Sequence, residues 1–255
     1  MPLDLSGLSR IEDAGLNASA TPQQRWVDGW IVRFSAGTAR RARCINAVAT
    51  GRLPLAERLA ECAQVYASVE LPMIVRITPF SRPDHLDVLL ENQGLHRLDD
   101  TVVMVLPDLG TLPPAPPGTA AIDAIGLETF AHRLGILRGS PLAHRQAHAQ
   151  RLTNSPVAFH AFELRVDGQP VAYGQYAAEG RLVGLYDIYT VERARGGGWA
   201  GVLCHHLLRR ARCAGATAAY LQVEERNLSA LSVYRRLGFT EGYRYHYRTR
   251  DPSTA

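Results

Sequence analysis

The sequence contains no lysine, so all 28 of its permanently basic side chains are arginines. Without a lysine amine the chain cannot form a Schiff base with a carbonyl substrate, which excludes one class of covalent mechanism. Cysteine is scarce as well, and the four cysteines, Cys44, Cys62, Cys204 and Cys213, form no CxxC pair. This scatter favours reduced, buried thiols over disulfides or a zinc site, so we expect no metal.

Long hydrophobic runs are also missing. No stretch of about 18 apolar residues could span a bilayer, and the N-terminal residues lack the basic start and apolar core of a secretory signal. The apolar content of 46% and the charged content of 20% are typical of a globular protein. The sequence therefore predicts a soluble, cytoplasmic protein with no membrane partner.

Positive charge is present but not concentrated. The formal net charge is +4 and the pI is near 9.0, yet the arginines are spread along the chain. Because nucleic-acid binding needs a clustered basic surface, we expect no nucleic-acid partner. The densest run, RRAR at 40–43, is interpreted as the solvent-facing edge of a strand. Part of the remaining positive charge can attract an anionic cofactor.

A proline-rich segment divides the chain. Residues 107–118 read PDLGTLPPAPPG and contain five prolines without a periodic apolar pattern, which predicts a semi-rigid linker. The expected domains are therefore residues 1–106 and 119–255.

The two halves show the same order of expected elements. Apolar periodicity and turn residues predict strands, helices and breaks in each half. In the N-terminal half these are a hairpin of 29–36 and 41–48 with a turn at Gly37, a helix over 55–69, a strand over 73–78, a helix over 85–93 and a strand over 101–106. In the C-terminal half they are helices over 127–152 broken near 139–141, strands over 157–166, 171–177 and 182–191, a helix over 201–213, a strand over 219–223, a helix over 228–237 and a last strand over 239–248. This repetition predicts an α/β protein with a tandem duplication.

The run Arg195-Gly196-Gly197-Gly198-Trp199-Ala200 lies between a predicted strand and a predicted amphipathic helix. The first amides of a helix have no internal partners and carry the positive end of its dipole. Glycines allow the backbone to approach phosphates closely, and Arg195 adds a planar donor for an anion. GxGxxG and GxxxxGK[ST] do not occur, which argues against a dinucleotide fingerprint and a P-loop. The layout favours a diphosphate ligand.

Residues 195–200 also have the R-x-x-G-x-A form of the acyl-CoA loop of GNAT-superfamily N-acetyltransferases, which the C-terminal half resembles. Residues 185–190 are similar to the strand before that loop, and 227–230 (N-x-x-A) with 234–239 (Y-x-x-x-G-F) resemble a second family signature. Trp199 and Glu192 depart from the usual pattern. The resemblance implies two tandem GNAT-like domains with a mixed sheet. The N-terminal domain lacks the loop, because residues 50–55 read TGRLPL, and is expected to bind no CoA.

The resemblance also implies acetyl-CoA as co-substrate and assigns its contacts. The residues expected to bind it are Arg195, Gly196, Gly197, Gly198, Trp199, Ala200 and Gly201 at the pyrophosphate, Ile188, Thr190 and Val191 along pantetheine, and Asn227 and Tyr234. Asn227 is equally suited to cap the helix that begins at Leu228. Tyr234 is expected to protonate the leaving thiolate, although packing alone could explain it.

The expected reaction is direct attack of a neutral amine on acetyl-CoA in a ternary complex. Asp187, Glu224 or Glu225 could remove the proton of the amine, and each could instead be structural or solvated. His144 and His148 have the i, i+4 spacing of a metal pair, but no third ligand is evident; they could also line the substrate cleft or form a polar helix face.

Two functions are compatible with these features. The first is an N-acetyltransferase acting on the amine of a small molecule or peptide, as a monomer or homodimer. The alternative is a non-catalytic acyl-CoA-binding or sensing protein. Tyr234 and the acidic candidates favour the enzyme.

Overall fold

The structure is a computed structural model that describes residues 4–35, 39–115 and 120–251. The expected turn at Gly37 and the end of the expected linker, 116–118, lie outside these ranges. The chain divides into two compact units. Unit 1 comprises residues 1–20 and 102–242, and unit 2 comprises residues 21–101 and 243–255. We describe each unit by itself.

These boundaries differ from the expected domains of 1–106 and 119–255. Strand β5 (His96–Leu106) begins in unit 2 and ends in unit 1, whereas β11 (Thr240–Thr249) begins in unit 1 and ends in unit 2. The proline-rich segment is not a free spacer where it is described. Its residue Leu109 is fully buried, and the Leu109 amide donates to the Thr217 carbonyl at 2.8 Å. Burying that apolar side chain attaches the segment to unit 1.

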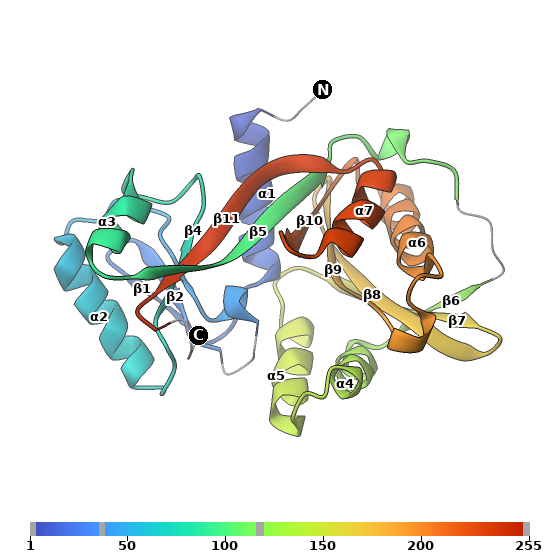
Figure 1. Cartoon of the computed structure of the whole chain (residues 1–255), viewed down its shortest axis with the longest axis horizontal. Coiled ribbons are helices and arrows are strands. Elements are labelled where there is room, and N and C mark those ends of the chain that lie inside the picture. The colour runs from blue at the N-terminus through green and yellow to red at the C-terminus, as the bar shows by residue number, and fades with distance from the viewer. Residues whose placement is uncertain (1–3, 36–38, 116–119, 252–255) are drawn as a thin grey trace. The chain divides into compact units, whose positions relative to one another are not determined.

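Unit 1 contains a mixed sheet with the strand order β5-β10-β9-β8-β7-β6 (Figure 1). The strands β6 to β9 pair antiparallel, and β9 pairs with β10 in parallel. The elements besides β5 and β11 are α1 (Leu5–Ala18), β6 (Ala121–Ile125), α4 (Leu127–Leu137), α5 (Leu142–Thr153), β7 (Phe159–Val166), β8 (Gln169–Glu179), β9 (Leu182–Thr190), α6 (Trp199–Cys213), β10 (Ala218–Glu224) and α7 (Leu228–Arg236). Helix α1 and strand β6 were not expected from the sequence. The break near 139–141 is confirmed as the turn between α4 and α5, which lie next to each other.

Unit 2 repeats this plan with shorter elements. They are β1 (Gln24–Val27), β2 (Trp30–Arg33), β3 (Ile45–Asn46), α2 (Leu55–Ala67), β4 (Ile74–Ile77) and α3 (Leu86–Asn92). The expected hairpin is confirmed by antiparallel pairing of β2 with β3, and β3 pairs with β4 in parallel. The RRAR run is not a strand edge. Residues Arg40–Ala42 form a 3-10 turn in which Arg40 forms an ion pair with Asp99.

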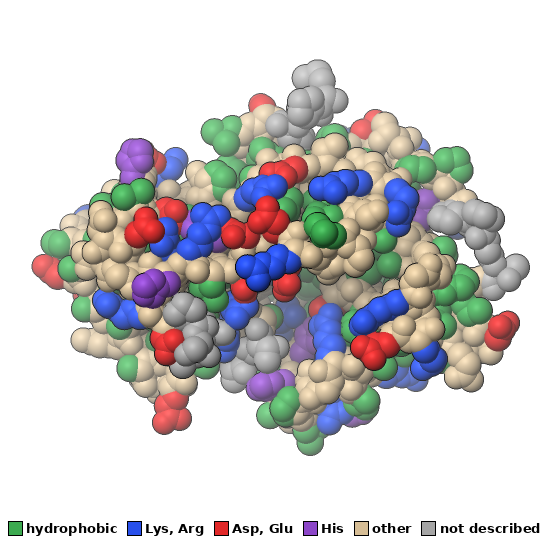
Figure 2. Space-filling view, in the orientation of Figure 1, with side chains coloured by type: hydrophobic (Ala, Val, Ile, Leu, Met, Phe, Trp, Pro, Cys, Tyr) green, Lys and Arg blue, Asp and Glu red, His purple; other side chains and the backbone are tan. Residues whose placement is uncertain are grey.

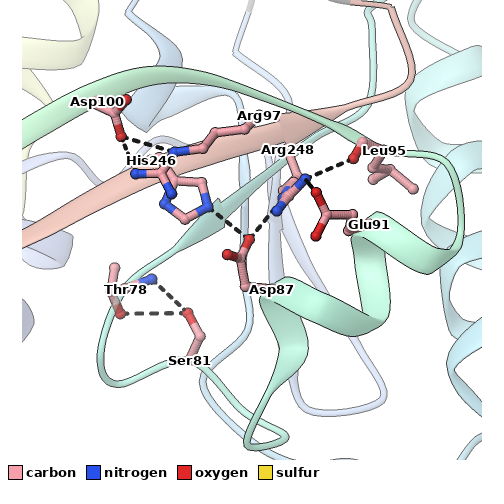
Figure 3. Close-up of polar contacts among 9 residues, drawn as sticks. All are labelled: Thr78, Ser81, Asp87, Glu91, Leu95, Arg97, Asp100, His246 and Arg248. Atoms are coloured by element: carbon pink, nitrogen blue, oxygen red, sulfur yellow. Dashed lines mark hydrogen bonds and ion pairs between the residues drawn. The ribbon is translucent and has the colours of Figure 1, made fainter.

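A network of charged side chains joins β11 to α3 within unit 2 (Figure 3). Asp87 accepts hydrogen bonds from His246 and Arg248, both at 2.7 Å, and Arg248 also donates to the Leu95 carbonyl at 3.1 Å. His246 and Arg248 are buried, so these bonds satisfy polar groups that would otherwise be costly to remove from water. The network fixes the end of β11 on unit 2.

The two halves of the chain share one order of elements. In the C-terminal half the order is β7-β8-β9-α6-β10-α7-β11, and in the N-terminal half it is β1-β2-β3-α2-β4-α3-β5, so each half ends with the strand that continues into the other unit. In both, the first helix connects two parallel strands. On the face shown in Figure 2, basic and acidic side chains are interspersed. None of the helices in the described ranges is long and apolar enough to cross a membrane.

Candidate active site

The site begins where β9 separates from β10. Their parallel register runs from the pair Leu182 and Ala218 to the pair Leu185 and Leu221. Strand β9 continues to Thr190 and β10 to Glu224 beyond that register. The divergence leaves backbone groups of β9 available to a ligand that lies along the strand.

A β-bulge shapes the same part of β9. Tyr173 of β8 pairs with Tyr189, but Gln175 pairs with Tyr186, so β9 has one extra residue between these pairs. Asp187 lies in the bulge with a φ of +50°, a left-handed conformation that is uncommon for residues other than glycine. Bulges redirect side chains and are frequent near active sites. Here the bulge directs the Asp187 side chain towards α4 and α5, to which it is bonded.

The glycine loop follows β9 and leads into α6. Gly196 and Gly198 have φ values of +81° and +77°, and Gly198 is the N-cap of α6 without a side-chain capping bond. The amides of Gly201 and Val202 donate to the Gly198 carbonyl. The amides of Trp199 and Ala200, which come before Gly201, are the first of the helix and lie at its positive end. The loop is therefore suited to bind an anion.

The loop, β9 and α7 together line a cleft of about 740 Å³. Nine of the twelve residues expected to bind the cofactor line it: Ile188, Thr190, Arg195, Gly196, Gly198, Trp199, Ala200, Asn227 and Tyr234. Val191, Gly197 and Gly201 do not. Val191 is buried and lines a second pocket, of about 530 Å³, beside Arg193 and Pro170.

The cleft also contains residues that the sequence reasoning missed. They are Tyr189 and Ala194, together with Ser229, Ala230, Ser232, Val233 and Arg236 of α7. Residues three or four apart lie on one helix face, so the positions of Asn227 and Tyr234 could have indicated this side of α7. Arg236 donates to Ser232 at 2.8 Å, which holds a second guanidinium at the wall of the cleft.

Asn227 and Tyr234 occupy opposite ends of α7. The Asn227 side chain accepts from the Ala230 amide at 3.1 Å and from the Ser229 hydroxyl at 3.0 Å, so it caps the helix as well as lining the cleft. Tyr234 is 8% exposed and packs edge-to-face on Phe239. Burial raises the pKa of Tyr234 well above its usual value. The phenol therefore carries its proton at neutral pH.

Asp187 is held by several donors. Its carboxylate accepts from Gln175 at 2.8 Å and from Arg138 at 3.0 Å, and it lies 3.2 Å from His148 Nε2. Burial alone would raise the pKa of Asp187, but His148 together with Arg138 and Arg151 outweighs burial and holds the pKa far below its usual range. Such a carboxylate stays ionised and is a weak proton acceptor.

The other acidic candidates lie elsewhere. Glu224 is exposed at the end of β10 and is not among the residues lining the cleft, and neither is Glu225. Across the described ranges, no three histidine, cysteine or acidic side chains are grouped so as to hold a metal ion.

Comparison with known families relates this geometry to a chemistry. A family model described as "Probable histone acetyltransferase Rv0428c C-terminal" matches residues 6–248. The chain belongs to this acetyltransferase family. As a member of the GNAT superfamily, it is an N-acetyltransferase. The match spans residues of both units, so the family includes the N-terminal part that lacks the glycine loop.

Individual relatives of this acetyltransferase support the assignment. It is 23% identical over 232 residues to the "Uncharacterized N-acetyltransferase YobR" of Bacillus subtilis, covering 88% of this chain and 91% of the relative. Its fold is similar to that of a GCN5-related N-acetyltransferase from Kribbella flavida, with a TM-score of 0.68, 17% identity and coverage of 96% and 95% of the two chains. It is also similar to a tandem GNAT protein from the clavulanic acid biosynthesis pathway, with a TM-score of 0.60, 13% identity and coverage of 77% and 70%. The fold is thus a GNAT fold of α/β class.

Proposed function

We propose that the cleft binds acetyl-CoA and that the acetyl group passes directly to an amine in a ternary complex. One observation carries this proposal: nine residues assigned from the sequence to acetyl-CoA line the same cleft. The pyrophosphate would bind the open amides at the start of α6, with Arg195 as an additional donor. Pantetheine would lie along β9 at Ile188 and Thr190, where β9 has separated from β10.

Two features of the cleft support catalysis. The strand backbone at Ile188 can align the thioester, and holding both reactants together supplies much of the acceleration. Tyr234 would be the proton donor for the thiolate of CoA, since its side chain lines the cleft. Asp187 and Glu224 are the acidic groups predicted as proton acceptors. Asp187 adjoins Ile188 of the cleft, but its lowered pKa makes it a weak acceptor, and Glu224 does not line the cleft.

The acceptor is proposed to be the amine of a small molecule or peptide. The second candidate function, acyl-CoA binding without catalysis, retains the cleft but needs no proton donor at Tyr234.

A thiol-release assay separates these functions. The protein is mixed with acetyl-CoA and a panel of amines that includes amino acids, polyamines and lysine-containing peptides, and free CoA thiol is followed. We expect acceptor-dependent thiol release together with saturable acetyl-CoA binding, which the fluorescence of Trp199 in the cleft can report. Binding without release across the whole panel would favour the sensing protein, and absence of binding would refute both.

A further inference from the structure

His148 is a titratable group that the proposed function does not use, and it contacts Asp187, the residue before Ile188 of the cleft. It lies on α5, and its buried Nε2 atom is 3.2 Å from an Asp187 carboxylate oxygen, an ion-pair contact and not a hydrogen bond. The side chain as a whole is 18% exposed, so the accessible part of the ring lies away from Nε2. Phe130 packs edge-on at 6.5 Å and restricts the ring further. One imidazole nitrogen thus lies against a carboxylate, while another part of the side chain is accessible.

Asp187 is built to hold that imidazole rather than to accept a proton itself. Gln175 and Arg138 donate to its two oxygens, and Gln175 is fully buried. The left-handed backbone of Asp187 is unfavourable, and such strain persists only where the surroundings fix it. The strained residue directly precedes Ile188, which lines the cleft.

We propose that His148 accepts the proton of the acceptor amine and that Asp187 is a positioning residue which orients His148 and stabilises its protonated form. This proposal rests on the proposed function. The acceptor ammonium gives one N–H proton to His148, and the freed lone pair of the amine attacks the thioester carbon. The C–N bond forms and the C–S bond breaks, and the departing thiolate takes a proton from Tyr234. The nitrogen loses its second N–H proton as the amide forms, and this proton passes through solvent to restore the Tyr234 phenol. His148 then returns its proton to solvent.

The groups around Asp187 and His148 come from four elements. His148 and Arg151 of α5 and Arg138 after α4 all favour the ionised form of Asp187 on β9. Gln175 of β8 is neutral and reaches only the carboxylate. A proton acceptor at this position makes the rate depend on pH, and Asp187→Asn should change that dependence.

The first test compares two matched variants of the full chain. His148→Gln removes the proton acceptor, and His144→Gln makes the same change one turn earlier on α5. With the best amine of the panel, we expect kcat to fall about 100-fold for His148→Gln, within the usual contribution of acid–base catalysis. His144→Gln should stay within about threefold of the wild type, and both variants should bind acetyl-CoA normally.

The second test uses pH and the acceptor to separate proton transfer from a structural role. Asp187→Asn should move the acidic limb of the kcat/KM profile to lower pH, because the protonated imidazole loses its carboxylate partner. Hydroxylamine is already neutral at neutral pH, so the deficit of His148→Gln should shrink at least about tenfold with this acceptor. An equal deficit with both acceptors, or an unmoved limb in Asp187→Asn, overturns the proposal. Loss of acetyl-CoA binding by the wild type would instead refute the proposed function.

Discussion

The segments before α6 and before α2 are equivalent in the order of elements, but their backbone amides differ in whether a side chain of the protein binds them. Before α6, glycines leave the amides open to the cleft. Before α2, the amides of Arg52 and Leu53 donate to the Asp28 carboxylate at 2.8 to 2.9 Å, and Arg58 donates to the same carboxylate. Unit 2 thus supplies its own anion where unit 1 offers a place for one.

Space around the glycines reinforces this difference. A Cβ on Gly196 or Gly198 would meet nothing within 4 Å, whereas one on Gly51 would lie 2.4 Å from both Arg58 and Asp28. The turn before α2 is filled by side chains of the unit. We therefore propose that unit 2 is a diverged GNAT-like domain that binds no CoA, as its missing loop indicates.

The largest effect is expected from placing a carboxylate beside the loop amides of unit 1, as Asp28 lies beside the turn amides of unit 2. Gly196→Asp places a carboxylate in the loop, where the open space and the tolerance of aspartate for a positive φ allow it to fit. We expect acetyl-CoA affinity to fall about 100-fold, or roughly 2.8 kcal/mol, by titration calorimetry. Gly196→Asn has nearly the same shape without the charge, and a loss as large as that of Gly196→Asp would show that charge is not the cause.

A second change would test whether the open cleft is also a catalytic one. Tyr234→Phe keeps the edge-to-face packing on Phe239 but removes the proton donor. We expect kcat to fall about 30-fold, which is below the usual contribution of acid–base catalysis because a thiolate leaves readily. Acetyl-CoA affinity and the unfolding temperature should not change by more than experimental error. An unchanged kcat would assign Tyr234 to packing alone.

The filled turn of unit 2 should matter for stability instead. The amides of Arg52 and Leu53 hold the pKa of Asp28 below its usual value, so the charged carboxylate stabilises the fold above that value and this contribution is lost as the pH falls through the lowered pKa. Asp28→Asn should lower the midpoint of thermal unfolding by several degrees at neutral pH, because Arg58 is buried. Acetyl-CoA should still bind with a single equivalent per chain. The exposed Asp84→Asn is the control, and a second bound equivalent in Asp28→Asn would contradict the comparison.

The smallest expected effect is a decrease of the unfolding temperature in mild acid. Burial lowers the pKa of His246, although Asp87 opposes that shift. The unfolded chain then binds the proton more readily, so stability is complete above about pH 6.5 and declines as the pH falls below it. We expect the unfolding temperature to fall by a few degrees between about pH 7.5 and about pH 5.5. His246→Gln should flatten this slope and the exposed His160→Gln should not; equal slopes would exclude His246 as the source.

The sequence predicted those parts of the molecule whose signals are local. The helix after Pro54 and the glycine loop before α6 follow from periodicity and from residues adjacent in the chain. Strand β6 was not predicted because most of its residues are exposed and its sequence lacks the alternation of apolar and polar residues that is typical of a half-buried strand. The contact of His148 with Asp187 and that of Asp28 with Arg52 join distant positions, and only the folded chain reveals them. The partners of β5 and β11 were missed for the same reason.

The course of β11 has a consequence for the order in which the protein can be assembled during synthesis. Strand β4 emerges from the ribosome more than 150 residues before its partner, since Ile74 pairs with Thr249. Until β11 is released, one edge of β4 is unpaired, and such edges invite association with other chains. We expect nascent chains that stop before residue 243 to need chaperone protection, because unit 2 is completed only when β11 pairs with β4.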